Sequence, residues 1–519
     1  MTSIEFLGTQ AGANKWQRLA PAAIIYFAIR FLVQIAKQGV QGLVPLAAVA
    51  VTAGENRWFI IGLIAVAAVT ALLVGAFLSF LKFRFRLSDD TVLIQSGVLK
   101  RKRLTLSYSR IQNIVFKQPI YFRPFGLVVL GIESAGSSSE EVSLGGIPRA
   151  LAEEIRTSVF TRKSNLAPNN IDTQNEDAAD IPADDAVTEE VIRQPLSELV
   201  RYGLSNSQIW VFASLGAALA AQIEWDDYEV LSGLQGQLNA LAEQGQFIAA
   251  MIAVSGIILS IVLLLGISVI GAIITYYDYH LTWSGGRFHR TRGLFERHET
   301  SLPEIKIQSL VIRQSWPARV LNRFHIQLKQ VGFSGPGGGQ PGMQGGNSKL
   351  LVPSVTNVFV QKFSRMVYPE FDWSLGKLKK IHRAYTHRIV LWIMMPIAVI
   401  PAIIMSFALS PAALAVTALP LLLAPAVMLR RARYGYATDG IYGIVRSGFI
   451  GHRLTLFPFY KVQTVQLWQS PGQRKKRLAS LTIKLAGTSL EIPYMALEDA
   501  EQWRDTILFQ IESRNETWM

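Results

Sequence analysis

The chain has 519 residues, of which half are apolar and only 17% are charged, and its mean hydropathy is +0.27. Water-soluble proteins of this size rarely carry so much apolar sequence, so the composition favours a membrane protein. The absence of cysteine excludes a disulfide scaffold, a thiolate zinc site, an iron–sulfur cluster and a cysteine nucleophile. The formal net charge of +14 suits an anionic partner, either phospholipid headgroups or nucleic acid.

Four runs of the sequence contain no Asp, Glu, Lys or Arg, namely 58–81, 204–223, 247–275 and 389–429. A helix of about 20 apolar residues spans the hydrocarbon core of a bilayer. The first three runs therefore predict one membrane pass each. The fourth is long enough for two passes, and Ser410-Pro411 at its middle predicts a turn between spans at 389–409 and 412–429.

The N-terminal region is open to two interpretations. Residues 1–18 show no cleavable signal, and residues 19–53 are apolar but contain Arg30 and Lys37. Arg30, Gln34 and Lys37 follow one another at helical spacing and form one polar stripe. This stripe belongs either to a membrane span or to a helix lying in the headgroup layer. We expect a span, because it gives three pairs of membrane helices, over 17–81, 204–275 and 389–429.

The long polar pieces after each pair, 82–203, 276–388 and 430–519, are rich in Lys and Arg. In contrast, the connection at 224–246 holds five acidic residues and no basic one. Cytoplasmic segments of membrane proteins carry an excess of positive charge. We therefore predict a multi-pass membrane protein with the polar pieces and both termini in the cytoplasm.

Three stretches of the polar sequence share the same landmarks at the same spacing. In each, a signature glycine precedes a large apolar residue, a first signature glutamine follows 15 residues later, a second glutamine follows six residues after that, and an apolar-Pro pair closes the stretch. The copies read Gly97, Gln112, Gln118 and Pro148; Gly293, Gln308, Gln314 and Pro353; and Gly448, Gln463, Gln469 and Pro493. Such agreement indicates an internal triplication.

Within each copy, short alternating or β-branched runs separated by Gly and Pro predict about seven strands. After the apolar-Pro pair the periodicity becomes helical, over 149–160, 354–367 and 497–511. Each copy is therefore predicted to be a small β-sandwich or barrel closed by one C-terminal helix. The fold class is an α+β membrane protein with three helix-hairpin pairs, each followed by such a module: module 1 at 82–163, module 2 at 276–370 and module 3 at 430–515.

A membrane helix pair followed by a module with the RIQNI stretch at 110 and the Gly97-Val98 pair resembles the bacterial pleckstrin-homology-like domain of membrane-flanked proteins. The resemblance covers nearly the whole chain and implies a pleckstrin-homology (PH)-like fold attached to the bacterial plasma (inner) membrane. It implies no particular chemical activity. Members of the family often accompany a shorter relative with a single module, so the resemblance also implies such a protein partner.

Two segments lie outside the repeat. Residues 164–195 contain eight acidic residues, one basic residue and no aromatic one, which predicts a disordered linker. Residues 332–347 contain eight glycines and formally match GxGxxG. The dinucleotide-binding motif requires a strand before it and a helix after it, whereas this segment lies between two predicted strands of module 2. We therefore predict a flexible loop.

No catalytic motif is present, since the sequence lacks GxxxxGK[ST], HExxH and GxSxG. His280, His289 and His298 fall on separate strands or turns, so neither a metal site nor another cofactor is expected. No recognition helix or RNA-binding motif supports nucleic acid as a partner. The sequence predicts a protein without enzymatic activity.

We predict that the protein is a membrane-anchored scaffold whose modules engage protein partners, for example by strand addition, and anionic membrane lipid as a further ligand. The alternative is a transporter-type or lipid-handling protein in which the modules regulate a path lined by Arg30 and Lys37. The candidate contact residues are the basic groups at turns and signature positions. They are Lys100, Arg101, Lys102, Arg103, Arg110, Lys306, Lys461, Arg474, Lys475, Lys476 and Arg477.

Overall fold

A computed structural model describes the fold of this chain. The described residues are 16–38, 57–88, 90–98, 101–108, 111–134, 142–166, 188–205, 246–330, 349–373, 378–396, 424–449, 451–486 and 488–514. The predicted span at 204–223, most of the span pair at 389–429, the glycine-rich loop and most of the linker lie outside them, as do Lys100 and Arg110. The chain divides into unit 1 (Met1–Ile192 and His280–Ser301) and unit 2 (Arg193–Tyr279 and Leu302–Met519).

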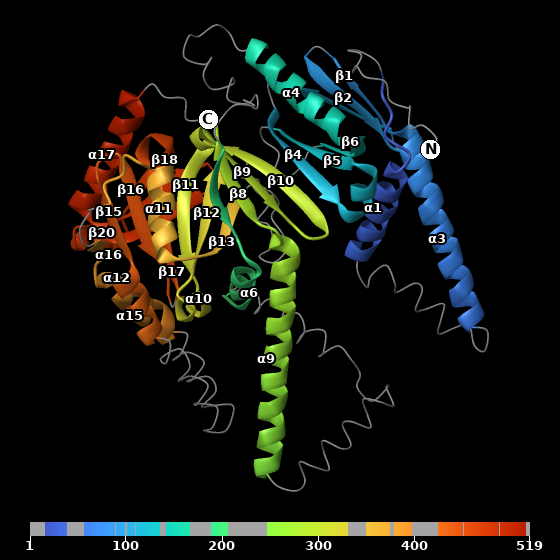
Figure 1. The fold of residues 1–519 in the computed structure, drawn as a ribbon. Coiled ribbons are helices and arrows are strands. Elements are labelled where there is room, and N and C mark those ends of the chain that lie inside the picture. Colours follow the sequence, from blue (N-terminus) through green and yellow to red (C-terminus); the bar gives the residue numbers. More distant parts are fainter. Residues whose placement is uncertain are drawn as a thin grey trace. The chain divides into compact units, whose positions relative to one another are not determined.

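Two long apolar helices, α3 (Arg57–Lys82) and α9 (Gln246–Tyr276), confirm the helices predicted at 58–81 and 247–275 (Figure 1). Within them, Gly62–Lys82 and Val254–Tyr276 are long and apolar enough to cross a membrane. Their apolar side chains point outward, and Leu63 and Val262 are about 60% exposed. Such a surface is stable against lipid rather than water.

A shorter helix accompanies each long one. In unit 1, α1 (Ala23–Gln38) packs beside α3, and its residues Ala23 and Phe27 are buried in the core of module 1. The Tyr26 hydroxyl lies 2.9 Å from the Ser143 hydroxyl, so the first half of α1 is attached to the module. In unit 2, α6 (Leu196–Ser205) packs against α9, and α12 (Ala384–Ile389) packs against α15 (Ala424–Arg433). The course of the chain between these helix partners lies outside the described residues.

Each module contributes six antiparallel strands in two groups of three, followed by one helix. Module 1 contains β1 (Arg84–Leu87), β2 (Thr91–Ser96), β3 (Lys102–Ser107), β4 (Ile111–Pro119), β5 (Leu127–Ser134), β6 (Val142–Pro148) and α4 (Arg149–Leu166). Module 2 contains β8 (His280–Ser284), β9 (Arg287–Arg292), β10 (Glu296–Pro303), β11 (Ile307–Gln314), β12 (Phe324–Gln330), β13 (Lys349–Val355) and α11 (Asn357–Val367). Module 3 contains β15 (Gly435–Thr438), β16 (Tyr442–Ser447), β17 (His452–Pro458), β18 (Val462–Trp468), β19 (Leu478–Leu485), β20 (Thr488–Ala496) and α17 (Leu497–Ser513). The C-terminal helices agree with the predicted ones.

The sheets differ from the expectation of one closed sandwich per module, because neighbouring modules share them. In unit 1 the last three strands of module 1 join the first three of module 2, in the order β6-β5-β4-β10-β9-β8-β7. In unit 2 the same arrangement joins modules 2 and 3, in the order β13-β12-β11-β17-β16-β15-β14. The sheets β1-β2-β3 and β18-β19-β20 keep three strands each. The signals for strands are local, whereas the choice of a partner strand is not, so the sequence pattern did not reveal this sharing.

The two junctions, which we call seam 1 (β4 against β10) and seam 2 (β11 against β17), have the same antiparallel register. In seam 1 the second signature glutamine, Gln118, faces Arg297, the fourth residue after the signature glycine. In seam 2 Gln314 faces His452, again the fourth residue after the signature glycine. The triplication is therefore conserved at the level of individual cross-strand pairs.

The signature residues have backbone roles that explain their spacing. Gly97, Gly293 and Gly448 all have left-handed φ values, of 104°, 114° and 138°. A Cβ atom at Gly448 would lie 2.2 Å from the Gly451 carbonyl oxygen, so only glycine fits the turn. The second glutamine stabilises the turn after its strand: the Gln469 side-chain amide donates to the carbonyl nine residues later, over 2.8 Å.

A short strand also precedes two of the helix pairs and pairs with the first strand that follows the membrane. It is β7 (Glu189–Arg193) for module 2 and β14 (Lys379–Lys380) for module 3, and Gln17 forms the corresponding single bridge to Phe85 in module 1. β7 falls within the segment predicted as a disordered linker, so the ordered part of the repeat begins before its membrane helices.

Candidate functional site

Two of the predicted basic clusters lie next to open sheet edges. Arg101, Lys102 and Arg103 are exposed at the beginning of β3, an edge strand of its sheet. The cluster at 474–477 is exposed on the short helix α16 (Pro471–Lys475) and the turn after it, directly beyond the edge strand β18. Their use as contact residues stays a prediction.

The signature lysines are placed differently. Lys461 is only 4% exposed, and its ammonium group donates to the carbonyl oxygens of Ile305 and Ile307 over 2.6 and 2.8 Å. It therefore holds module 3 to the beginning of β11 instead of offering its charge at the surface. Lys306 is half-buried in the short 3-10 helix Glu304–Lys306.

The edge strand β18 is far more exposed than its counterpart β11. Gln463, Thr464, Gln466 and Trp468 of β18 are exposed, whereas all but one of the residues of β11 are buried by the strands on both sides. An open edge presents unpaired backbone groups that can bind another strand.

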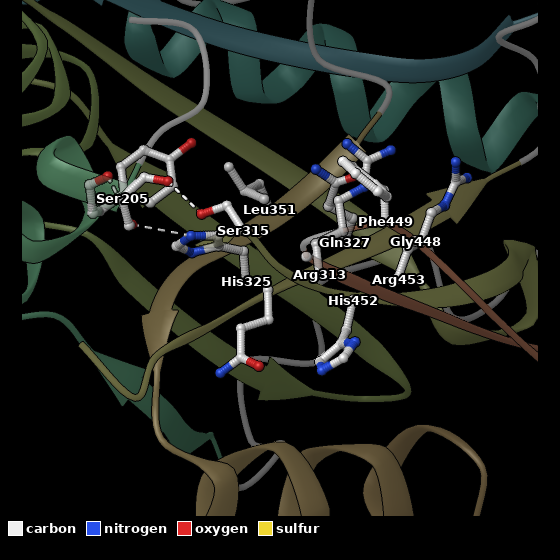
Figure 2. A pocket seen from close by; sticks show the side chains of 13 residues that line it. Ser205, Arg313, Ser315, His325, Gln327, Leu351, Gly448, Phe449, His452 and Arg453 are labelled. Carbon is white, nitrogen blue, oxygen red and sulfur yellow. Dashed lines mark hydrogen bonds between the residues drawn. The ribbon is translucent and has the colours of Figure 1, made fainter. Parts of the chain in front are cut away.

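A cavity of about 310 Å³ lies at seam 2, entirely within unit 2 (Figure 2). It is lined by side chains from α6, β11, β12 and β13 and by the turn that leads into β17. Its lining residues are Tyr202, Ser205, Arg313, Gln314, Ser315, His325, Gln327, Leu351, Gly448, Phe449, Gly451, His452 and Arg453. No Asp or Glu is among these described residues.

Two arginines meet directly across seam 2 at this cavity. Arg313 of β11 and Arg453 of β17 form a cross-strand pair, in which Cβ atoms are typically about 5 Å apart. The Nε atom of each guanidinium is buried and has no hydrogen-bond partner within the described part of the chain. Burial, followed by the nearby charge of Arg453, lowers the pKa of Arg313, but a guanidinium remains protonated under all ordinary conditions. Two like charges are therefore held close together, and none of the described residues that line the cavity is an acid that could compensate them.

His325 of β12 faces Arg313 on the side away from Arg453, and it is held in its neutral form. The Ser354 backbone N–H donates to Nδ1 over 3.1 Å, so Nε2 carries the proton and donates it to the Ser205 hydroxyl, also over 3.1 Å. Burial, followed by the charge of Arg313, lowers the pKa of His325 to about 4. At neutral pH the positive charge of the cavity therefore comes from its arginines.

The wall containing Ser205 is positioned by a carboxylate outside the cavity. Glu198 of α6 accepts hydrogen bonds from Arg323 at 2.8 and 2.9 Å, from the Ser354 hydroxyl at 2.7 Å, and from Arg201. Burial by itself raises the pKa of Glu198, but these hydrogen bonds outweigh it and lower the pKa to about 2. Glu198 thereby fastens the helix that leads toward the membrane to strands β12 and β13.

The sequence did not single out this cavity. Its cationic residues come from strands that are 140 positions apart in the chain, at Arg313 and Arg453. A signal did exist, because Arg313 precedes a signature glutamine and Arg453 is the fifth residue after a signature glycine. Among the described residues, no group of three or more His, Asp or Glu could hold a metal ion.

The comparisons with known proteins agree with the repeat seen in the sequence and the fold. A family model described as a bacterial PH domain matches the chain three times, over residues 39–163, 237–351 and 389–510, more than half of its length. The chain is also similar to the UPF0699 transmembrane protein YdbT of Bacillus subtilis (strain 168). The two are 24% identical over 479 residues, which cover 91% of this chain and 93% of that protein. The chain belongs to the bacterial PH domain family, as a membrane protein with three copies of the domain.

Proposed function

We propose that this protein is a non-catalytic scaffold of the bacterial plasma membrane that assembles with a second copy of itself through the open edges β3 and β18. The three modules and both termini lie on the cytoplasmic side, where basic segments are retained. Assembly of this kind joins modules along the membrane surface, and the helix pairs keep each module at that surface.

The observation that carries the proposal is that the chain already uses the same contact twice. β18 is the counterpart in module 3 of β4 and β11, and β3 is the counterpart in module 1 of β10 and β17. One edge of each kind is left over at the two ends of the series. The two edges are complementary to each other, not to themselves, so their pairing is a head-to-tail contact that produces rings or rows.

The two seams also predict the register of this contact. By equivalence with Val311 facing Thr455 in seam 2, Gln466 of one chain should face Leu104 of the next. Trp468, which is 42% exposed, should then face Lys102, a pair that favours a cation–π contact. The basic clusters at both edges flank this junction.

Disulfide cross-linking in native membranes tests the register, because the natural chain contains no cysteine. One population of chains carries Gln466→Cys and a co-expressed population carries Leu104→Cys. Directly opposed residues have Cβ atoms about 4.5–5.5 Å apart, close enough to be linked after a small adjustment. We expect a linked dimer only when both variants are present, and not when Thr105→Cys replaces Leu104→Cys, since Thr105 points to the other face of the sheet.

Four results would overturn the proposal. One is the absence of the linked dimer, and another is equal linking through Thr105. The third is that a chain carrying both cysteines forms only an internal bond and migrates as a monomer. The fourth is that Gln466→Cys captures a different, shorter protein. As a second measurement, Gln466→Lys should reduce the size of the complex extracted in mild detergent, because a charge on an edge strand opposes pairing. Gln502→Lys, at an exposed position of α17, is the matched control and should leave the size unchanged.

A further inference from the structure

We propose that the cavity at seam 2 is a binding site for a phosphate-bearing anion, held mainly by Arg313 and Arg453. This inference does not depend on the proposed self-assembly, since all lining residues belong to unit 2 of one chain. The chemistry that the site recognises is a phosphate group that also offers a hydroxyl, either in a lipid headgroup or in a soluble phosphate compound.

The first argument is the unbalanced charge of the cavity. Like charges directly opposite each other on neighbouring strands destabilise a sheet, and buried charges normally have a hydrogen-bonded counter-ion. Arg313 and Arg453 are such an opposed pair, and the Nε atom of each is buried without a partner. An anion between them would remove the repulsion and accept these hydrogen bonds.

The second argument is that the surroundings cannot provide that anion. The described lining contains no carboxylate, and its only arginines are the opposed pair Arg313 and Arg453. The Arg446 guanidinium lies 3.3 Å from the His452 ring nitrogen Nδ1. Burial, followed by the charges of Arg446, Arg433 and Arg319, lowers the pKa of His452 to about 4. His452 and Arg446 lie on the opposite face of β17 from Arg453, so this neighbouring group adds positive charge around the site and supplies no acid to it.

The third argument concerns the kind of anion. The forked N–H groups of arginine match the oxygens of phosphate and bind them in pairs. The side-chain Oε1 of Gln327, also at the cavity, is buried without a donor. A chloride ion could not satisfy this acceptor, whereas a protonated phosphate or a phosphate ester with a neighbouring hydroxyl offers both acceptors for the arginines and a donor for Gln327.

The two serine hydroxyls in the wall donate to backbone carbonyls, so the donors that face the anion come chiefly from Arg313 and Arg453. The Ser315 hydroxyl donates to the Ser205 carbonyl over 2.6 Å, and the Ser205 hydroxyl donates to the Tyr202 carbonyl over 3.0 Å. Figure 2 shows Ser205 and His325 at one side of the view and Arg453 at the other, with Arg313 and Gln327 between them.

Binding of radiolabelled inorganic phosphate to the full chain in a neutral detergent tests the proposal, with the phospholipid that remains bound after purification measured in the same preparation. We expect saturable phosphate binding or about one retained phospholipid per chain. Arg313→Gln and Arg453→Gln should each weaken binding about 10- to 100-fold, as expected for losing a charged hydrogen-bonding group. The control is the double variant Lys362→Gln and Arg365→Gln, which removes two exposed charges of α11 in the same module and should bind normally.

Two further measurements separate the possible outcomes. Thermal unfolding without phosphate distinguishes a binding role from a structural one, because neutralising one of two opposed, partly buried arginines should not lower the midpoint. Reconstitution into nanodiscs of phosphatidylcholine, with or without phosphatidic acid, identifies the source of the phosphate group. If phosphate binding is lost in nanodiscs that contain phosphatidic acid but not in those without it, the natural ligand is a lipid headgroup. If phosphate binding is the same in both kinds of nanodisc, the natural ligand is a soluble compound. The proposal is overturned if neither phosphate nor phospholipid binds the wild-type chain, or if binding is the same in the two arginine variants.

Discussion

Seam 1 and seam 2 are built on the same register and differ in how their charges are balanced. In seam 1 the corresponding pair is Lys117 and His298, of which His298 is neutral because its pKa is lowered to about 3, and Glu296 lies 3.6 Å from the His298 ring. In seam 2 the position of Glu296 is occupied by Gly451, and the opposed pair is Arg313 and Arg453. Seam 1 therefore places one cation opposite a neutral histidine with an acid nearby, whereas seam 2 places two guanidinium groups opposite each other. Duplication of one contact has produced both a structural joint and a candidate binding site.

The two seams also differ on the opposite face of their sheets, where seam 1 has an ion pair and seam 2 has an apolar contact. In seam 1, Arg149 at the start of α4 binds both carboxylate oxygens of Glu299, at 3.1 and 2.9 Å. The counterpart of Glu299 in seam 2 is Leu454, which faces Ile312 in an apolar contact. Fixed ion pairs hold one seam and apolar packing holds the corresponding face of the other.

The largest expected effect concerns the signature glycines, which both seams share. Gly293→Val and Gly448→Val should each destabilise the protein by about 3 kcal/mol, because both glycines have φ values that disfavour side chains and both would clash with a carbonyl oxygen. Chemical denaturation of the full chain measures the loss. Gly472→Ala is the control, since a Cβ there meets no atom within 4 Å. If valine at either glycine left the stability unchanged, the two turns would not be structurally equivalent.

A smaller loss is expected where seam 2 is attached to its membrane helix. Glu198→Ala should cost about 2 kcal/mol, because it removes hydrogen bonds to a charged group and leaves Arg323 without its partner. The pKa of Glu198 is lowered to about 2, so its contribution is complete above pH 4.5 and is lost as the pH falls toward 2. A denaturation series over this pH range measures both effects. If the stability of Glu198→Ala fell between pH 4.5 and pH 2 as steeply as that of the wild-type chain, this role of Glu198 would be contradicted.

The difference in charge between the seams can be reversed at one residue. Gln327→Glu places a carboxylate at the cavity of seam 2, as Glu296 places one near the corresponding pair of seam 1. It should stabilise the protein by about 1 kcal/mol in the absence of anions and abolish phosphate binding. Thermal unfolding with and without phosphate provides both readouts. A destabilised variant that still binds phosphate would contradict the proposed site.

The smallest effect concerns seam 1 in acid. Burial, followed by the charges of Arg292, Lys117 and Arg290, lowers the pKa of His298 to about 3. The unfolded chain binds a proton here near pH 6.5 and the folded chain does not, so stability is lost as the pH falls from 6.5 toward 3. His298→Gln should make this part of the profile shallower, as measured by unfolding midpoints from pH 7 to pH 4. An identical slope in the variant would show that other groups dominate.

The features that could be predicted from the sequence are those that depend on residues close together in the chain. The signature glycines mark turns with left-handed backbone, and the apolar runs of α3 and α9 mark helices, because these signals do not depend on distant residues. The shared sheets could not be predicted, since β4 and β10 are equally compatible with pairing inside their own modules. The cavity was missed for the same reason: Arg313 and Arg453 become neighbours only through strand pairing between modules.

The division of module 2 between the two units has a consequence for how the protein is made. The seven-stranded sheet of unit 1 requires β4 and β10, which are separated in the chain by the linker and the whole second membrane segment. The edge of β4 therefore has no partner strand until some 180 further residues have been synthesised and inserted and β10 has left the ribosome. During this interval the nascent chain exposes an edge that other polypeptides could occupy. A truncation after residue 163 would make that exposure permanent, so fragments cut at the apparent module boundaries should aggregate more readily than the full chain.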